Sequence, residues 1–458
     1  MPTFEPSVAL SENLGSHGIQ FVSHAINAVQ RLLPHVEVSS WQEGSWAQPG
    51  CVWTSASRRD VRVTLSFGTK ANTSSISISA VVRRRRIPGA TSIAAETIDT
   101  REHQICDLIA NRVSEFLTNA PSLLQDPTSL KAISRDFDES IVSEHIQRHH
   151  KLELPVSAVL RTLHTLSEQS YENKALTFGC ILNPHDATPA GDDSFPADFL
   201  RSKKYKALSD GFRTAYLVST YGSVVDFLDL DRAGKVKLSE KNHYPDWTEP
   251  LAKASRGGRC GIALSRQGDI LVFDEGTLRL TYRYGQWQYW NHSHLVKLLR
   301  DRAKAQRVPK TVLGRVVGAI YRVALDVSFR RSGGLFVILH NQNTLHDIVR
   351  QGDAIGDTDR HSTDTSFDRV IAKRAIQSLP RSVAVELASL DGAVVLRNSG
   401  QVVAYGAVLQ PKKSGRLHGS EGSRTKAAIG ASNYGLAVKI SSDGDISVYY
   451  DGKEFIRV

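Results

Sequence analysis

The sequence has few cysteines and no long apolar run, and both absences exclude classes of protein. Its four cysteines, Cys51, Cys106, Cys180 and Cys260, lie far apart and form no CxxC pair. That spacing favours reduced, buried thiols in a cytoplasmic protein over a disulfide framework or a zinc site. A membrane-spanning helix needs about 18 apolar residues in a row, and no such run occurs. We therefore expect no membrane span.

The composition is also unlike that of a disordered chain. Apolar residues make up 41% of the 458 residues and charged residues 23%, which is usual for globular proteins. At about 100–200 residues per domain, this length predicts two to four domains. The first 13 residues lack the basic segment and apolar core of a secretory signal. We therefore expect the protein to stay in the cytoplasm.

The net charge is +10, with a pI near 9.4. Such a surface favours anionic partners, namely nucleotides, nucleic acid or acidic lipid, without choosing among them. The densest basic run, Arg83-Arg84-Arg85-Arg86, follows an alternating segment at 75–82 that predicts a strand. The simpler interpretation of the run is a charged strand end in solvent. The alternative is a phosphate-contacting patch in a nucleic-acid-binding protein.

Periodicity and turn residues predict an α/β and α+β protein of several domains. We expect an N-terminal α+β region at 1–170, a β-rich α/β domain at 171–305, and a C-terminal mixed sheet flanked by helices at 310–458. Helices are expected at 18–33, 102–116, 139–149, 155–168, 311–328, 367–379 and 382–390. Strands are expected at 52–54, 61–67, 75–82, 214–219, 224–229, 260–264, 270–273, 278–284, 335–339, 393–396, 402–409, 437–440 and 446–450.

Two smaller features leave alternatives open. His145 and His149 are four residues apart, so on a helix they share a face, and two histidines at that spacing can ligate zinc. No third ligand is evident, and surface histidines are the simpler interpretation. Trp287, Tyr289 and Trp290 are either core residues or a stacking surface, and the core is the safer interpretation.

An internal echo links the second and third regions. Residues 265–276 and 441–452 match at a constant offset of 176 positions, with six identical and two similar residues. A basic Gly/Ser turn precedes each segment, at 255–259 and 422–426. Both segments are consistent with unrelated hairpins. Self-similarity at a fixed period also marks repeats, so we weigh duplication as a hypothesis.

Four motifs follow one another in the third region. A strand, Gly333-Gly334-Leu335-Phe336-Val337-Ile338-Leu339, comes first. Next are Asp391-Gly392-Ala393, the turn Gly422-Ser423-Arg424-Thr425-Lys426, and Ser441-Ser442-Asp443-Gly444-Asp445-Ile446-Ser447-Val448. In this order and spacing they resemble the diadenylate cyclase (DAC) domain, over about 310–458. Residues 171–305 look like a DAC-associated sensor domain.

The resemblance implies a nucleotide site. In the family, two ATP molecules lie face to face across a dimer and are joined to cyclic di-AMP, so the resemblance implies a homo-oligomer and Mg²⁺ or Mn²⁺ if the site is catalytic. Asp391 matches the carboxylate near the ribose hydroxyl. Gly392, Ala393 and Leu409 match positions that contact the nucleotide. Gly422, Ser423, Arg424, Thr425 and Lys426 match the phosphate-binding turn, where amides at a helix start hold phosphate oxygens.

The same comparison shows departures from the family. Thr425 stands where the family has His, and Ser441-Ser442 stand where it has the metal-binding Glu-Glu. Neutral hydroxyls are poor ligands for a hard divalent cation, and Asp443, displaced from that position, is the candidate replacement metal ligand. We therefore expect a sensor of ATP or a cyclic (di)nucleotide. The alternatives are an active diadenylate cyclase and a nucleic-acid-binding protein.

Overall fold

A computed structural model of the chain describes residues 8–33, 36–45, 50–57, 60–71, 74–84, 100–119, 126–191, 194–232, 237–357, 362–371, 374–412 and 422–458. The chain divides into two compact units. The first comprises residues 1–238 and 247–290, and the second comprises residues 239–246 and 291–458. The bounds of the three expected domains stay predictions.

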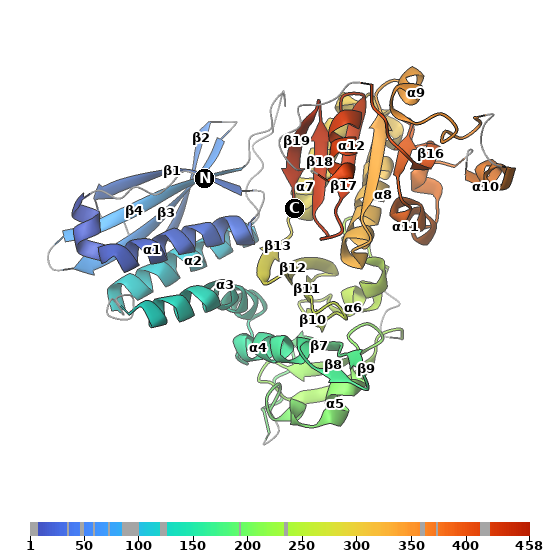
Figure 1. Ribbon diagram of the computed structural model, residues 1–458. Coiled ribbons are helices and arrows are strands. Elements are labelled where there is room, and N and C mark those ends of the chain that lie inside the picture. Colours follow the sequence, from blue (N-terminus) through green and yellow to red (C-terminus); the bar gives the residue numbers. More distant parts are fainter. Residues whose placement is uncertain are drawn as a thin grey trace. The chain divides into compact units, whose positions relative to one another are not determined.

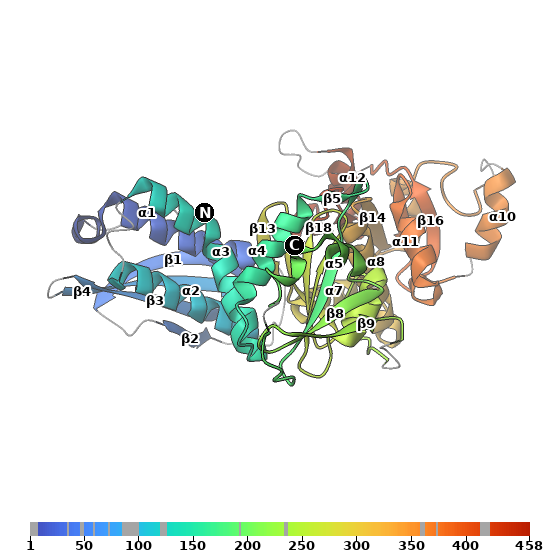
Figure 2. The ribbon, with the colours of Figure 1, turned by 90° about the horizontal axis from the view of Figure 1, so that it is seen from below.

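The first unit begins with an antiparallel sheet whose strands run in the order β1-β4-β3-β2. Helices α1, α2 and α3 lie on one side of this sheet (Figures 1 and 2). Phe21 of α1 packs edge-on against Phe116 and Phe137, with ring centroids 5.4 and 5.7 Å apart. The elements are α1 Val8–Leu32, β1 Val36–Ser45, β2 Gly50–Ser57, β3 Asp60–Ala71, β4 Ser74–Arg84, α2 Thr100–Asn119, α3 Pro127–His150 and α4 Val156–Ser167.

A seven-stranded mixed sheet completes the first unit, in the order β13-β12-β11-β10-β7-β8-β9. The β7–β8 pair is parallel, and the other pairs are antiparallel. Every residue of β7, β10 and β11 is buried, as expected for strands covered on both faces. The elements are β5 Ser170–Tyr171, β6 Lys174–Ala175, β7 Phe178–Asn183, η1 Phe199–Arg201, α5 Lys203–Leu208, β8 Thr214–Ser219, β9 Val224–Asp229, α6 Glu249–Ala254, β10 Cys260–Leu264, β11 Ile270–Asp274, β12 Thr277–Arg283 and β13 Gln286–Tyr289.

The second unit is a six-stranded mixed sheet between helices, in the order β16-β15-β14-β17-β18-β19. Helix α12 covers the face that carries Leu335 and Val337. A Cβ on Gly334 would meet α11 and α8 instead, so these two helices cover the other face. The elements are η2 Asp246–Thr248 (which the boundary between the units crosses), α7 His292–Ala305, α8 Lys310–Arg330, β14 Gly334–Leu339, η3 Gln342–Thr344, α9 Leu345–Ile348, α10 Ser362–Ile371, η4 Ile376–Ser378, α11 Arg381–Ser389, β15 Ala393–Leu396, β16 Val402–Ala407, α12 Ser423–Ala431, β17 Gly435–Ile440, β18 Ile446–Tyr450 and β19 Lys453–Arg457.

These two mixed sheets share one topology. Read from one edge, β9-β8-β7-β10-β11-β12 of the first unit corresponds to β16-β15-β14-β17-β18-β19 of the second. In each sheet the pair formed by the second and third of these strands is parallel, and the other pairs are antiparallel. A helix precedes the fourth strand in both, α6 in one and α12 in the other. The strand orders therefore agree with the duplication hypothesis.

The hydrogen bonds of matching turns agree as well. Ser265 N donates to Asp269 O at 2.8 Å, and Ser441 N donates to Asp445 O at 2.9 Å. The Oγ of Ser265 accepts from Asp269 N at 3.1 Å, and the Oγ of Ser441 accepts from Asp445 N at 3.0 Å. The matching register and side-chain bonds therefore add to the agreement of the strand orders with the duplication hypothesis.

Most expected helices and strands are present, with some differences. The expected strands do not include 178–183, where the buried strand β7 lies. The helix expected at 367–379 lies at 362–371 and is followed by η4. Cys106, Cys180 and Cys260 are free and buried, as expected, and Cys51 lies outside the described side chains. Among the described residues, no helix has the length and apolar character of a membrane span.

Candidate functional site

Register brings the predicted motifs to one end of the second unit's sheet. Phe336 pairs with Val394 in parallel, so β14 and β15 start at the same end. Gly334 pairs with Ile440 in the antiparallel direction, so β17 finishes there. The Asp391-Gly392 turn, the start of α12 and the 441–445 turn therefore belong to this end of the sheet.

The start of α12 carries the predicted phosphate turn. Gly422 is the N-cap, and no side chain among the described residues caps the helix end. The amides of the first turn of a helix have no partners within the helix, so these donors suit an oxyanion. Ser423 and Lys426 are exposed.

Arg424 and Asp391 come together from separate elements. Their atoms Nη2 and Oδ1 are 3.7 Å apart, with Asp391 fully exposed and Arg424 about one third exposed. Gly333 makes room for the arginine, because a Cβ at residue 333 would lie 2.5 Å from the guanidinium Nη1. The structure thus brings a carboxylate and a guanidinium of two separate motifs side by side, a contact that the sequence did not predict.

Gly392 has a conformation that requires glycine. Its φ is +111°, and a Cβ would lie 2.4 Å from the carbonyl carbon of Gly406. Ala393 is buried at the start of β15 and pairs with Ala407. The chain beyond Ala407 reaches half-buried Leu409, which packs against the core beneath α12. This tight turn leaves the Asp391 side chain exposed.

Lys439 is a member of this site that the sequence reasoning missed. It is 9% exposed within β17, and its Nζ donates to Oγ1 of Thr425 at 3.0 Å. Burial lowers the pKa of Lys439, and the charges of Arg457 and Arg424 act in the same direction, while Glu454 and Asp445 oppose them. The one signal in the sequence is a lysine inside an otherwise apolar strand.

The 441–445 turn shows little that would bind a metal ion. The Ser441 hydroxyl accepts a backbone hydrogen bond within the turn, from Asp445 N. Ser442 and Asp443 are exposed. Among the described residues, Asp443 belongs to no group of three ligating side chains. A metal role for Asp443 therefore stays a prediction, and hydroxyls are a poor donor set for Mg²⁺ or Mn²⁺.

One histidine of the pair in the first unit is buried, and the other is partly exposed. His145 is buried, which corrects the simpler interpretation of the sequence. Its ring stacks on His149 with centroids 5.8 Å apart, and burial lowers the pKa of His145 to about 3. The helix face was predicted correctly, but the elements that cover it are distant in sequence.

His149, His150 and Asp274 form one group with metal-ligand spacing among the described residues. Arg101 already pairs with Asp274, and its Nη2 lies 3.4 Å from His149 Nε2. Burial alone would raise the pKa of Asp274, but the bond to His149 and the charge of Arg101 lower it. A guanidinium thus neutralises the carboxylate, and we read the group as an ion-pair network.

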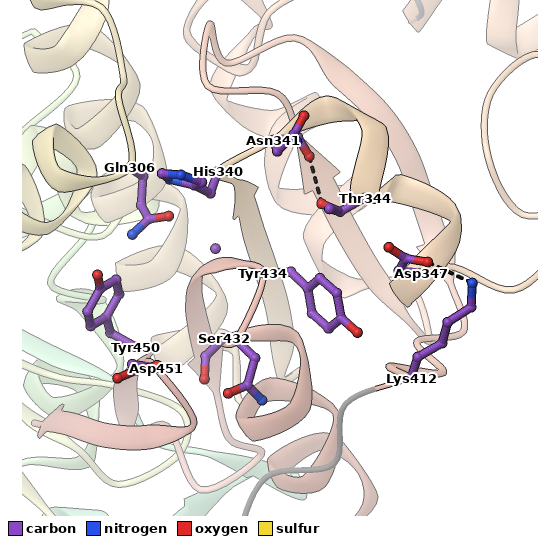
Figure 3. A pocket seen from close by; sticks show the side chains of 12 residues that line it. Gln306, His340, Asn341, Thr344, Asp347, Lys412, Ser432, Tyr434, Tyr450 and Asp451 are labelled. Atoms are coloured by element: carbon purple, nitrogen blue, oxygen red, sulfur yellow. Dashed lines mark hydrogen bonds and ion pairs between the residues drawn. The ribbon is translucent and has the colours of Figure 1, made fainter.

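A pocket of about 570 Å³ lies at the other end of the second unit's sheet (Figure 3). His340 follows β14 there, and Tyr450 ends β18. Lys412 and Asp347 at its rim form an ion pair of 2.7 Å. None of the predicted site residues lines this pocket, so it is separate from the Asp391 and Arg424 end.

Comparison with known families agrees with the motif order. Residues 323–454 match the family model described as DAC, DisA bacterial checkpoint controller nucleotide-binding. These residues form a DAC domain. The match starts within α8 and finishes in β19, so it includes every predicted site residue of the second unit. The first unit lies outside the match.

Two solved structures are similar to part of the chain. A double mutant of DacA from Staphylococcus aureus is 23% identical, with a TM-score of 0.23, over 30% of this chain and 83% of that one. A hypothetical membrane spanning protein from Bacillus cereus is 21% identical, with a TM-score of 0.25, over 36% of this chain and 74% of that one. No curated protein matches the chain.

Proposed function

We propose that the DAC domain binds ATP or a cyclic (di)nucleotide and acts as a sensor rather than as a cyclase. The observation that carries this proposal is the Arg424–Asp391 pair beside the start of α12, which no described side chain caps. Amides at a helix start and a guanidinium together suit a phosphate, and a carboxylate suits a ribose hydroxyl. The residues that this chain shares with the family's motif, Asp391 and Arg424, are ones suited to binding a nucleotide.

The departures from the family favour sensing over catalysis. Joining two nucleotides requires charge stabilisation at the reacting phosphate, usually with a divalent cation. The positions of the metal-binding carboxylates hold Ser441 and Ser442, and the Ser441 hydroxyl is engaged in its own turn. The position of the family's His holds Thr425, whose hydroxyl accepts from Lys439. Binding needs none of the lost groups.

Isothermal titration calorimetry with ATP and cyclic di-AMP tests the proposal. The wild-type protein should bind at least one of them. Arg424→Met should weaken that binding at least about tenfold, because a charged hydrogen bond is worth about 1.5–3 kcal/mol. Arg315→Met makes the same charge change on an exposed position of α8 and should bind like the wild type. No binding of either ligand would end the proposal.

An active diadenylate cyclase is the alternative. Incubation with ATP and Mg²⁺ or Mn²⁺, followed by mass spectrometry of the product, distinguishes the two. We expect no cyclic di-AMP. If product forms and Asp391→Asn abolishes it, the domain is a cyclase and the sensor proposal is wrong.

Two further proposals concern the rest of the protein. Residues 171–305 would act as a related sensor or dimerisation domain, since their sheet shares the DAC topology. The protein would form a homo-oligomer, which light scattering measures directly. Arg85 and Arg86 lie outside the described residues, so a nucleic-acid role stays a prediction from charge alone.

A further inference from the structure

The buried lysine of β17 is the least expected feature of the DAC domain. Strand β17 is buried throughout and otherwise has the sequence Gly-Leu-Ala-Val-Ile. Burying an amine costs free energy unless it has polar partners, and an apolar residue would pack there at no such cost. Nonetheless Lys439 lies on an inner strand of this sheet. It is one residue before the last residue of β17, at the end of the sheet to which the site motifs belong.

The Lys439 side chain points toward the phosphate turn. It lies on the face that α12 covers, because residue 439 pairs with Leu335, which packs beneath α12. Its Nζ reaches Thr425 in the first turn of α12, at 3.0 Å from Oγ1. Lysine has three donors, and this bond occupies one of them.

The charges around Lys439 favour an added anion. Arg424 and Arg457 both lower its pKa, so positive charge is concentrated around the amine. Of the carboxylates that act on it, Glu454 is already bonded to Tyr449 and to Arg457, at 3.0 and 2.7 Å. Asp445 lies in the 441–445 turn and is exposed. A bound phosphate would relieve the repulsion between Lys439 and the two arginines.

We infer that Lys439 is a phosphate-binding residue of this site, and that it allows the DAC domain to bind its nucleotide without a divalent cation. This inference rests on the nucleotide binding proposed above. Lys439 and Arg424 together supply two positive charges, as many as one Mg²⁺. Arg424 adjoins Thr425, which replaces the family's His, and Lys439 lies two residues before Ser441 and Ser442, which replace the metal-binding Glu pair.

The first test is titration with ATP and with cyclic di-AMP, in EDTA and in Mg²⁺. Wild-type affinity should agree within about threefold between the two conditions. Lys439→Met, which keeps the length of the side chain, should weaken binding at least about tenfold, and Lys439→Arg should restore most of it. Lys453→Met removes a charge from an exposed position of β19 and should have no effect.

A second test leaves the buried Lys439 unchanged. Ser441→Glu with Ser442→Glu returns the family's carboxylates to the turn. In EDTA these two charges should repel the phosphates and weaken binding, and Mg²⁺ should restore it. The altered protein would then need the metal that the wild type does not.

The outcomes separate this inference from the proposed function. If the wild type binds only with Mg²⁺, the inference is wrong and nucleotide binding stands. If folded Lys439→Met binds like the wild type in EDTA, the lysine is not the phosphate-binding residue. If the wild type binds no nucleotide under either condition, the proposed function itself fails.

A pH profile gives an independent measurement. The groups that face Lys439 are Thr425 and Arg424 of α12, Arg457 and Glu454 of β19, and Asp445 of the turn. An anion beside the amine raises its pKa, so binding takes up a proton once the free amine starts to titrate. Wild-type affinity should therefore fall as the pH rises through the lowered pKa of Lys439. Lys439→Arg should show no such fall, because arginine stays charged.

Discussion

The two mixed sheets have the same strand order but differ at the end where the DAC site lies. In the first unit, Asp210 precedes Gly211 before β8, as Asp391 precedes Gly392 before β15. The Asp210 carboxylate accepts from the amides of Phe212, Arg213 and Thr214, at 2.8, 2.7 and 3.0 Å. The Asp210 carboxylate is therefore hydrogen-bonded within its own turn. The Asp391 carboxylate is instead exposed and faces Arg424.

The helices before the fourth strand differ in the same way. Helix α6 starts with Glu249-Pro250, which puts a negative charge at the helix start. Helix α12 starts with Ser423-Arg424. An acidic first turn competes with an anionic ligand. The same turns and core packing thus support this topology in both units. A few residues at one end of the sheet decide whether it can bind a phosphate.

The largest expected effect concerns the helix that crosses from the third strand to the second. In the DAC domain this is α11, and its Arg381 makes a bidentate pair with buried Asp326, at 2.6 and 2.8 Å. Arg381→Met would leave that buried carboxylate without its counter-ion, with only the Asp246 amide, among the described residues, still donating to it at 2.7 Å, so we expect a loss of about 3–5 kcal/mol in the free energy of unfolding. Urea denaturation measures it.

A matched control lies in the same unit. Arg330 pairs with Glu386 at 2.7 Å, but both side chains are exposed. Arg330→Met should cost at most about 1 kcal/mol, as usual for surface pairs. Equal losses in the two variants would mean that the buried pair holds α11 no more strongly than a surface pair does.

Acid should destabilise the first unit. His145 in the first unit is buried, with a pKa of about 3, and burial also lowers the pKa of His24 and of His150. Below pH 6.5 the unfolded chain protonates a histidine that the folded unit keeps neutral, so stability is lost as the pH falls from 6.5 toward 3. The slope for one histidine reaches about 1.4 kcal/mol per pH unit.

His145→Phe removes that titration while keeping a ring. Between pH 6.5 and 5, the wild-type first unit should lose about 2 kcal/mol more than the variant, measured by urea denaturation at each pH. The same loss in both proteins would show that His145 titrates normally and is not the buried neutral group described here.

Sequence reasoning predicted the elements and the site unequally. The helix of α8 and the strands before and after the DAC motifs were clear from periodicity. Strand β7 was missed, because Phe178-Gly179-Cys180-Ile181-Leu182 is buried on both faces and shows no alternation, and Pro184 follows it closely. An apolar run that short does not separate strand from loop.

The sequence could indicate those site residues that belong to a recognisable motif. The motif order indicated that Asp391 and Arg424 belong to one site, but it did not predict that they form an ion pair. The roles of Lys439 and His145 do not follow from a motif, because each depends on an element that only the folded chain brings close. Thr425 is 14 positions from Lys439, and Asp274 is more than a hundred positions from His145.

The smallest expected effect tests the shared origin of the sheets most directly. Ser255 ends α6 and Ser432 ends α12, and both are buried. The Ser255 hydroxyl donates to Ala252 O at 2.9 Å and accepts from Gly276 N at 3.3 Å. The Ser432 hydroxyl donates to Ile429 O at 2.7 Å and accepts from Gly452 N at 2.9 Å.

Ser255→Ala and Ser432→Ala should therefore destabilise their own units by similar amounts, about 1–2 kcal/mol each, because each leaves one buried amide without its acceptor. Ser239→Ala, at an exposed serine, serves as the control for the loss of a hydroxyl. Differential scanning calorimetry resolves the two units if they melt separately. If only one unit loses stability, the serine hydrogen bonds stabilise one sheet and not the other. The two sheets would then be stabilised by different contacts.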